Sequence, residues 1–175
     1  MVAQKNAASK PAAQAHAGLT LSNGSEPISI LLVDDDADCR LLIRDAISDC
    51  KVCNKVYEAS DGAEALDYLY QRGRFKGVAR PGLIYLDIEM PGLDGQETLK
   101  QIRANPEFRE IPIVMMTGVS DEQQMKLAAT NGANSYTIKP ANAEQFLRTV
   151  LASTNYWLSI HQSPAHHLRP EDCRR

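Results

Sequence analysis

The sequence predicts an α/β protein built on a doubly wound, five-stranded parallel sheet, and three observations support this fold class. Short apolar runs alternate five times with segments whose apolar residues recur at helical spacing. Each apolar run ends in polar or charged residues, as buried strands do where they enter a loop. A helical segment follows every predicted strand. Unbroken β-α alternation of this kind favours parallel strands with helices on both faces.

The first two β-α units are predicted near the start of this pattern. Residues 28–33 are almost entirely apolar, which is typical of a strand buried on both faces, and residues 55–60 form a weaker strand. Asp36 or Asp38 can cap the first helix, which runs to about residue 49, and Asp61 can cap the second. The expected apolar stripes comprise Leu41, Leu42, Ala46 and Ile47 in the first helix, and Ala63, Leu66, Leu69 and Tyr70 in the second.

An unusually long connection at residues 71–82 precedes the third strand. It contains three glycines and a proline, together with the basic residues Arg72, Arg74, Lys76 and Arg80. Charged runs like this are most often solvated loops, and a partner-docking role is the alternative. The connection leads into an apolar strand that ends abruptly in Asp87, and Pro91, Gly92 and Gly95 then mark a tight loop.

The remaining elements follow in the same alternation. They are a helix from 95 to about 105, a strand at 111–116, a helix at 121–130 with Met125, Ala128 and Ala129 on one side, a strand at 135–138 and a final helix. Asn142 and Gln145 resemble a capping box at the start of that final helix, which is expected to extend to Trp157 and Leu158.

Composition divides the 175-residue chain into one domain and two tails. Residues 1–27 have few large apolar side chains and are predicted to form a disordered arm, residues 28–158 form the domain, and residues 159–175 form a flexible tail. The formal net charge of −3 provides no basic field of the kind that binds nucleic acid. No apolar run approaches the length of a membrane span, so we expect no membrane association and a cytoplasmic location.

Two groups of potential metal or redox ligands give weaker signals. Cys50 and Cys53 form a C-x-x-C motif, but no second pair follows it. The tail histidines, His161, His166 and His167, match no zinc-binding spacing. Neither group is expected to carry the function.

Polar side chains gather where the predicted strands end. The set comprises Asp34 and Asp35 after the first strand, Asp87 at the end of the third, and Thr117 and Lys139 after the fourth and fifth. In a parallel sheet these positions share one edge, where the ligands of doubly wound folds bind. An acidic pair can hold Mg²⁺, a further carboxylate can accept a phosphoryl group, and a lysine and a hydroxyl can neutralise its oxygens. Each residue alone fits a turn or a surface ion pair, but the joint arrangement favours phosphoryl transfer.

This pattern resembles the response-regulator receiver domain of two-component signalling, with its (βα)5 flavodoxin-like fold. The similarity spans about residues 28–153 and is carried by Val33-Asp34-Asp35-Asp36, Leu86-Asp87-Ile88-Glu89-Met90-Pro91-Gly92, Met116-Thr117-Gly118 and Tyr136-Thr137-Ile138-Lys139-Pro140. The resemblance implies that Asp87 is the phosphoacceptor and that Lys139 pairs with the phosphoryl oxygens. The implied ligands of Mg²⁺ are Asp34, Asp35, Asp87 and the backbone carbonyl of Glu89.

The resemblance also implies a conformational switch. Thr117 would move toward the phosphoryl group, and the ring of Tyr136 would turn from an outward to an inward position. A cis bond between Lys139 and Pro140 is implied as well, and the X-Pro bond makes it accessible because the cis form costs only about 0.5–1 kcal/mol.

Three positions around the implied site bear on how the switch behaves. Gly118 stands where alanine is more usual in the family, which should leave space beside the Tyr136 ring and loosen the loop. Glu89 and Val119 occupy the positions that tune the lifetime of the phosphoryl group in the family, and this combination gives no sign for that lifetime.

The expected function is that of a single-domain response regulator phosphorylated by a sensor histidine kinase. The predicted tail is too short for a DNA-binding or enzymatic output domain, so we expect signalling through altered dimerisation or partner binding, with no turnover of an external substrate. Two features resemble those of the stand-alone regulators of bacterial phytochrome kinases, namely the long connection 71–82 and the segment Tyr156-Trp157-Leu158. That likeness implies a homodimer through the fourth helix, fifth strand and fifth helix. Trp157 fits such an interface and a core-closing role equally well.

Three alternatives to this function use the same residues. A phosphorelay intermediate would pass its phosphoryl group to a histidine phosphotransfer protein, and the sequence does not separate it from the first reading. A phosphatase of the haloacid dehalogenase type also combines a strand-end Asp, Mg²⁺, Thr and Lys. It needs a second Asp two residues after the nucleophile, where this chain has Glu89, and a cap-sized insertion that the sequence lacks. A receiver unable to accept phosphate is disfavoured by the intact set of site residues.

Overall fold

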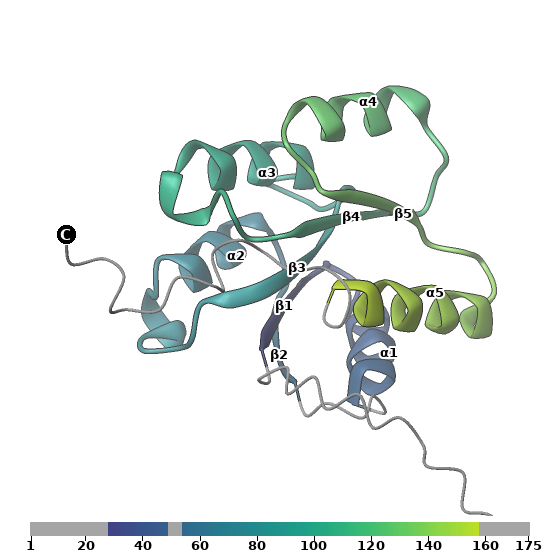
Figure 1. Ribbon diagram of the computed structural model, residues 1–175, viewed down its shortest axis with the longest axis horizontal. Coiled ribbons are helices and arrows are strands. Elements are labelled where there is room, and N and C mark those ends of the chain that lie inside the picture. The colour runs from purple at the N-terminus through teal and green to yellow at the C-terminus, as the bar shows by residue number, and fades with distance from the viewer. Residues whose placement is uncertain (1–27, 49–53, 158–175) are drawn as a thin grey trace, which may run out of the picture.

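Five parallel strands form a single sheet in the order β2-β1-β3-β4-β5 (Figure 1). The computed structural model describes residues 28–48 and 54–157. The strands are β1 (Ser29–Val33), β2 (Lys55–Ala59), β3 (Pro81–Asp87), β4 (Ile113–Thr117) and β5 (Ser135–Ile138). The predicted arm, tail and C-x-x-C motif lie outside the described residues. The doubly wound parallel sheet is confirmed.

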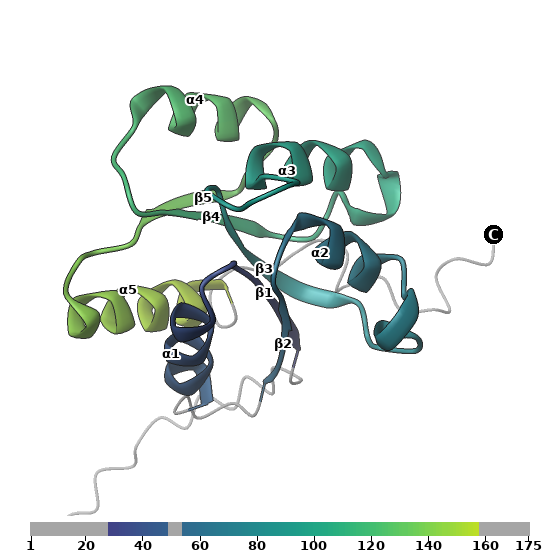
Figure 2. The same cartoon turned by 180° about the vertical axis from the view of Figure 1, so that it is seen from behind.

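Helices cover both faces of this sheet. They are α1 (Ala37–Ser48), α2 (Gly62–Leu69), α3 (Gly95–Ala104), α4 (Glu122–Thr130) and α5 (Ala143–Asn155), with 3₁₀ turns η1 (Gly73–Phe75) and η2 (Pro106–Phe108). Figures 1 and 2 show α1 and α5 on one face and α2, α3 and α4 on the other. Each of these α-helices begins after a side chain that accepts a first-turn N–H, namely Asp36, Asp61, Asp94, Asp121 and Asn142.

The strands divide their side chains between two cores. Leu31 and Val33 of β1 pack toward α2, α3 and α4, whereas Ile30 and Leu32 pack toward α1 and α5. This alternation follows from the two-residue repeat of a strand. All five residues of β1 are buried, as the apolar run at 28–33 predicts. The central strands are therefore fixed on both faces, and their carboxyl ends are held at one edge.

Five predicted stripe positions are wrong, because Leu41, Ala63, Tyr70, Met125 and Ala129 are exposed. Leu41 is 45% exposed, because the buried side of α1 runs through Ile43, Ala46 and Ile47 at the i, i+3, i+4 spacing of a narrower stripe. Tyr70, at the end of α2, is exposed. Met125 is 40% exposed, because α4 packs near the edge strand β5 and Ala128 is its buried side chain.

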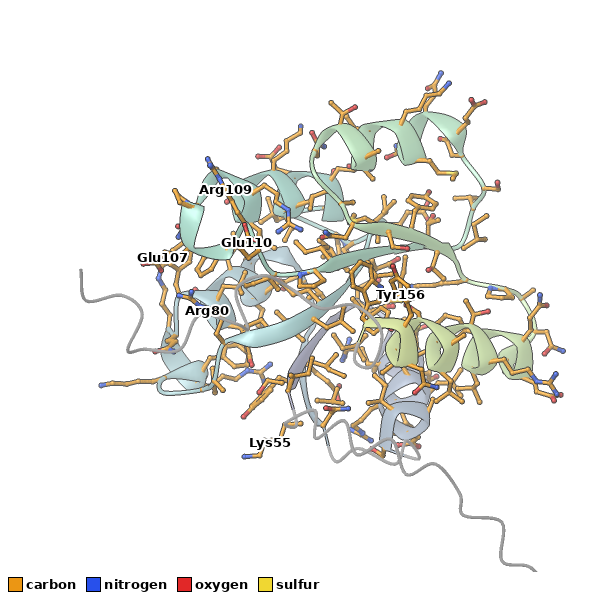
Figure 3. The ribbon with its side chains drawn as sticks, viewed as in Figure 1. Lys55, Arg80, Glu107, Arg109, Glu110 and Tyr156 are labelled. Carbon is orange, nitrogen blue, oxygen red and sulfur yellow. The ribbon has the colours of Figure 1, made fainter. Side chains whose placement is uncertain are left out.

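The basic connection before β3 is a solvated loop with one buried anchor, Phe75. Its arginines lie over aromatic rings: Arg72 over Tyr70 at 4.6 Å, Arg74 over Phe75 at 4.6 Å and Arg80 over Phe108 at 5.4 Å. Arg80 also forms an ion pair with Glu107 at 3.2 Å, and both are labelled in Figure 3. The solvated reading of this loop is confirmed, and its charges are largely paired within the chain.

The aromatic pair after α5 closes one of the cores. Trp157 is half-buried and packs against the cluster that contains Phe146 and Val150. Tyr156 is exposed and contacts the Trp157 ring edge-on, with 5.2 Å between centroids. The core-closing role of Trp157 is confirmed, the extension past α5 is described as far as Trp157, and Leu158 lies outside the described residues.

Candidate functional site

Asp87 lies at the carboxyl end of β3, in the middle of the sheet. It pairs in register with Met116 of β4, and the next residue, Ile88, donates its backbone N–H to the Met116 carbonyl at 3.0 Å. These contacts continue the strand through Asp87, whose exposure is only 5%. A carboxylate fixed here stands at the edge where doubly wound folds bind their ligands.

Asp34 and Asp35 follow β1, the neighbour of β3. Asp34 is fully buried, and its carboxylate accepts the Asp36 N–H at 3.0 Å and the Lys139 ammonium at 2.6 Å. Asp35 is exposed. One carboxylate oxygen each from Asp34, Asp35 and Asp87 lies within 4.8 Å of the others. In the described part of the chain no other trio of acidic, histidine or cysteine side chains comes this close.

Lys139 follows β5 and bridges two of these acids. Its backbone N–H donates to the Thr117 carbonyl at 2.6 Å, and its ammonium lies 2.6 Å from Asp34 Oδ2 and 3.0 Å from Asp87 Oδ1. Burial lowers the pKa of Lys139, but the hydrogen bond with Asp34 and the charges of both acids outweigh burial and raise it. Lys139 therefore stays protonated, and its single positive charge is shared between the Asp34 and Asp87 carboxylates.

The Asp87 carboxylate is only partly compensated by these contacts. Its Oδ1 atom is buried, and no donor in the described residues directs a hydrogen bond at it, although the Lys139 ammonium is 3.0 Å away. Burial raises the pKa of Asp87 to about 6, while Lys139 opposes the rise and Asp34 adds to it. A buried, underpaired oxygen beside two further carboxylates fits a hard cation such as Mg²⁺, which prefers oxygen ligands. The residues present therefore fit the predicted metal.

Thr117 ends β4, the neighbour of β3, and Tyr136 lies on β5, one strand further from Asp87. The Thr117 hydroxyl accepts the Val119 N–H at 3.2 Å and donates to the Val119 carbonyl at 3.3 Å, so it is engaged within its own loop. The Tyr136 ring packs inward against the core, and its buried hydroxyl lies close to the Thr117 side chain. Burial raises the pKa of Tyr136. The ring is thus inward while Thr117 still bonds its own loop.

The loop from Asp87 to α3 is packed closely against the strand end. The Gly95 N–H donates to the Ile88 carbonyl at 3.0 Å, and a Cβ on Gly95 would lie 2.0 Å from the Asp87 carbonyl oxygen. Gly92 has φ +77°, in the left-handed region that favours glycine. Glycine at these two positions therefore lets the loop return beside Asp87. Glu89 lies on this loop with its side chain exposed, and its backbone carbonyl as a metal ligand stays a prediction.

The sequence analysis did not identify two arginines of α1 that lie next to the acidic cluster, or their partner on β2. Arg40 of α1 donates to the Asp34 carbonyl and pairs with Glu58 of β2 at 3.2 Å, and Arg44 holds the other Glu58 oxygen at 2.9 Å. The four-residue spacing of the two arginines, opposite a lone acid on an edge strand, was the available signal. Cys39 is half-buried beside Asp34, and burial together with a hydrogen bond between its thiol and the Asp34 side chain raises the pKa of the thiol to about 12.

Two expectations about the loops after β4 and β5 have different outcomes. The expected cis bond between Lys139 and Pro140 is wrong, since no peptide bond in the described chain is cis. The trans form is the intrinsically preferred one, and the Lys139 N–H already ties this segment to the Thr117 carbonyl. The expected space at Gly118 is confirmed, because a Cβ there would meet nothing within 4 Å.

The fold and this site together define a class of protein: a doubly wound domain with three carboxylates and a lysine at the carboxyl edge of its sheet. A sequence model described as the response regulator receiver domain matches residues 30–151. The chain belongs to this family of response-regulator receiver domains, and the resemblance seen in its motifs is confirmed.

Similar proteins extend this assignment. The probable methanogenesis regulatory protein FilR2 of Methanothrix harundinacea is 36% identical over 141 residues, which cover 79% of this chain and 89% of that protein. The phosphorylated cyanobacterial phytochrome response regulator RcpA superposes with a TM-score of 0.76 at 33% identity, covering 79% and 99% of the two chains. The Mn²⁺-bound response regulator Rcp1, a protein of Synechocystis sp., gives a TM-score of 0.74 at 29% identity, with the same coverage.

These matches confirm that the chain is a response regulator of two-component signalling with phytochrome-associated relatives. They favour a signalling domain over a phosphatase of the haloacid dehalogenase type. Within residues 28–48 and 54–157, no helix has both the length and the apolar character needed to cross a membrane.

Proposed function

We propose that Asp87 accepts a phosphoryl group from a phosphohistidine of a sensor kinase. One observation carries the proposal: the buried Asp87 Oδ1 lies 3.0 Å from the Lys139 ammonium, in a cluster with Asp34 and Asp35. A nucleophilic carboxylate beside a fixed cation at a sheet edge is what phosphoryl transfer requires, because the protein contributes mainly position and charge.

In this reaction a bond forms between an Asp87 carboxylate oxygen and phosphorus, while the bond from phosphorus to the kinase histidine nitrogen breaks. The electron pair of the breaking bond stays on that nitrogen. The Lys139 ammonium, already 3.0 Å from Asp87, would neutralise a phosphoryl oxygen. Asp34, Asp35 and Asp87, with the Glu89 carbonyl, would hold Mg²⁺, which supplies further neutralisation of the phosphoryl oxygens when bound.

Thr117 and Tyr136 would respond to phosphorylation of Asp87 by changing their hydrogen bonds. The Thr117 hydroxyl must leave the Val119 backbone to bind a phosphoryl oxygen, and the two bonds it would break are weak at 3.2 and 3.3 Å. The space next to Gly118 accommodates that movement. Because the inward Tyr136 hydroxyl already lies close to the Thr117 side chain, a shift of Thr117 would change the hydrogen bonding of the ring.

The output would be an altered association through α4, β5 and α5. Large apolar side chains are exposed along these elements, namely Met125, Leu127, Ile138 and Tyr156. The phytochrome relatives support a phytochrome among the candidate kinases. We propose one receiver domain over residues 28–158 flanked by the arm and tail, acting in the cytoplasm. It would catalyse its own phosphorylation and dephosphorylation without turning over another substrate.

Labelling with acetyl phosphate tests the phosphoacceptor. The wild type should take up phosphate in the presence of Mg²⁺, and Asp87→Asn should take up none. Asp45→Asn, which removes an exposed carboxylate of α1, is the matched control and should label like the wild type. Equal labelling of Asp87→Asn and the wild type would refute the assignment.

Two further assays separate the alternatives. Rapid loss of label to a histidine phosphotransfer protein would favour a phosphorelay intermediate, whereas retained label would favour a terminal regulator. Steady turnover of p-nitrophenyl phosphate would instead support a phosphatase. Sizing with and without beryllofluoride and Mg²⁺ reports the dimer change, and identical profiles would contradict a dimer switch.

A further inference from the structure

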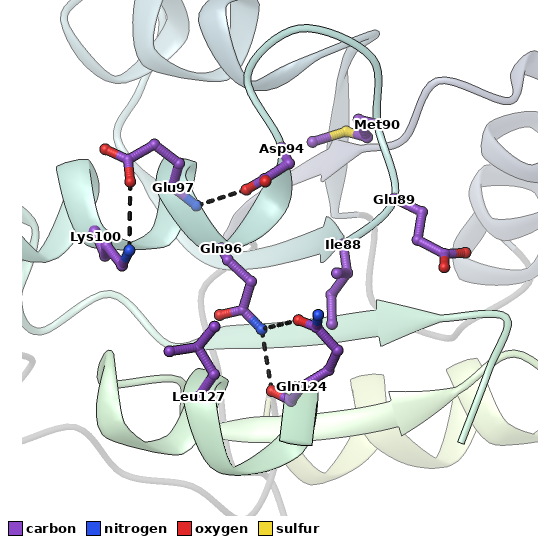
Figure 4. A pocket seen from close by; sticks show the side chains of 9 residues that line it. All are labelled: Ile88, Glu89, Met90, Asp94, Gln96, Glu97, Lys100, Gln124 and Leu127. Atoms are coloured by element: carbon purple, nitrogen blue, oxygen red, sulfur yellow. Dashed lines mark hydrogen bonds and ion pairs between the residues drawn. The ribbon is translucent and has the colours of Figure 1, made fainter. Parts of the chain in front are cut away.

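A groove of about 510 Å³ lies between α3 and α4, beside the loop that follows Asp87 (Figure 4). Its residues come from that loop, from α3 and from α4. Its volume falls in the range of recognised binding pockets, and its open shape suits an elongated segment. It shares the Glu89 backbone with the proposed metal site and Leu127 with the exposed α4-β5-α5 surface, and its other lining residues belong to neither.

The groove has an apolar floor and one apolar wall. Ile88 and Met90 are almost completely buried beneath it, and Leu127 of α4 is 40% exposed on its side. Gln96 of α3 closes the floor by donating to both the backbone carbonyl and the side-chain oxygen of Gln124, each at 3.0 Å (Figure 4). These hydrogen bonds use the floor's amide groups within the chain, so what remains for an occupant is chiefly apolar contact.

The charges around the groove are unequal. Glu89, Asp94 and Glu97 line it, and Lys100 is the one basic residue among its lining side chains. The Lys100 ammonium lies 3.5 Å from Glu97 Oε2, so this cation is already paired within the chain. Glu89 forms no ion pair within the described residues. The rim is therefore acidic, and it complements a basic occupant.

We propose that this groove binds a short, basic, amphipathic helix of a protein partner. Two flanking helices with an apolar floor between them match the helix-in-groove mode, in which apolar residues at i, i+3 and i+4 enter the groove. Lysine or arginine on the flanks of that helix would face the acidic rim. α3 has ten residues, which makes it about 15 Å long, so about three turns of partner helix would fill the groove.

The test uses the full-length, unphosphorylated protein, so its outcome is independent of the proposed phosphorylation. The probe is a fluorescent 14-residue peptide of leucine and lysine in amphipathic helical order, and its counterpart carries glutamate in place of every lysine. Anisotropy titrations should show binding of the lysine peptide and none of the glutamate peptide. Equal binding of both peptides would overturn the charge argument.

Two matched pairs of variants locate the binding. Leu127→Ser removes the apolar wall, and Leu41→Ser removes a similarly exposed leucine on α1. Glu97→Gln removes a rim charge of α3, and Glu144→Gln removes an exposed α5 charge that is also paired within its helix. The groove variants should weaken binding about three- to ten-fold, the size expected from partial loss of one apolar contact or one charge pair, and the controls less than two-fold.

Three outcomes would overturn the proposal. The first is equal weakening by the groove and control variants, which would mean diffuse attraction to an acidic protein. The second is self-association of the wild type that Leu127→Ser and Glu97→Gln both abolish, which would assign the groove to a second copy of this chain. The third is failure of the lysine peptide to bind at all. Thermal melts should show all four variants folded, because each changed side chain is substantially exposed.

Discussion

α3 and α4 lie next to each other on the same face of the sheet, yet they are attached in different ways (Figure 1). α3 buries five of its ten residues, including Leu99 and Ile102, which are fully enclosed. α4 buries Ala128 alone among its nine residues, and its largest apolar side chains are 40% exposed. Burial of apolar area dominates local stability, so α3 is part of the stable core and α4 is the element that can move at low cost.

A chain of contacts connects the candidate site to both helices. Gly95 places the start of α3 against the Asp87 carbonyl, and Gln96, the next residue, donates two hydrogen bonds to Gln124 of α4. Asn131, just past the end of α4, donates to Gln96 at 3.2 Å. A rigid helix thus joins the phosphoacceptor to a loosely packed one, an arrangement suited to passing a change at Asp87 outward.

The largest expected effect tests the burial difference directly. Leu99→Ala should lower the free energy of unfolding by about 4 kcal/mol, because it leaves a cavity in the core, whereas Leu127→Ala should lower it by less than about 1 kcal/mol. Urea denaturation measures both. Similar losses for the two variants would mean that α4 is as firmly packed as α3.

The negative charge of the buried Asp87 carboxylate, next to the start of α3, destabilises the folded state. Burial raises the pKa of Asp87 from 3.8 to about 6, so the folded state binds this proton more tightly than the unfolded state. The contribution to stability is present below pH 4 and is lost as pH rises to 6, by about 3 kcal/mol in metal-free protein. Asp87→Asn should remove this part of the pH dependence. Parallel stability curves for the wild type and Asp87→Asn in EDTA would contradict the shift.

The close approach at the start of α3 gives a third test. Gly95→Ala forces a Cβ toward the Asp87 carbonyl and should cost about 2 kcal/mol through overpacking, with slower labelling of Asp87 by acetyl phosphate. Gly118→Ala is the control, since its Cβ meets nothing within 4 Å, and it should be neutral or slightly stabilising. Unchanged stability and labelling in Gly95→Ala would show that this contact does not hold Asp87.

The smallest expected effect concerns the link between the two helices. Gln96→Ala should lower the free energy of unfolding by about 1 kcal/mol and speed amide exchange in α4 more than in α3, because the bonds to Gln124 and Asn131 are lost. Gln101→Ala, an exposed glutamine on α3, should change neither. Equal acceleration in both helices would indicate general loosening instead of a lost link.

The strand-end residues were predictable because their places depend only on where each apolar run stops. Asp34, Asp87 and Lys139 meet because parallel strands end at one edge, and that follows from the β-α alternation. Contacts set by tertiary packing were not predictable. Gln96 of α3 donates to Gln124 of α4, which is 28 residues further along the chain, and nothing local in the sequence indicates this.

The misjudged helix faces have a related cause. Helical periodicity identifies an apolar side of α1 and α4, but the neighbouring elements decide how much of that side is covered. Leu41 and Met125 fall on apolar stripes and remain exposed, because the sheet and the adjacent helices reach only part of each stripe. The low burial of α4 is thus a property of its position beside the edge strand.

The most direct test of the central claim is to locate the phosphoryl group chemically. The full-length protein is treated with acetyl phosphate and Mg²⁺, reduced with borohydride, which converts an aspartyl phosphate to homoserine, and digested for tandem mass spectrometry. Homoserine is expected at position 87 and at no other aspartate, with none in Asp87→Asn. Homoserine at Asp34 or Asp35, or its appearance in Asp87→Asn at the wild-type level, would contradict the claim.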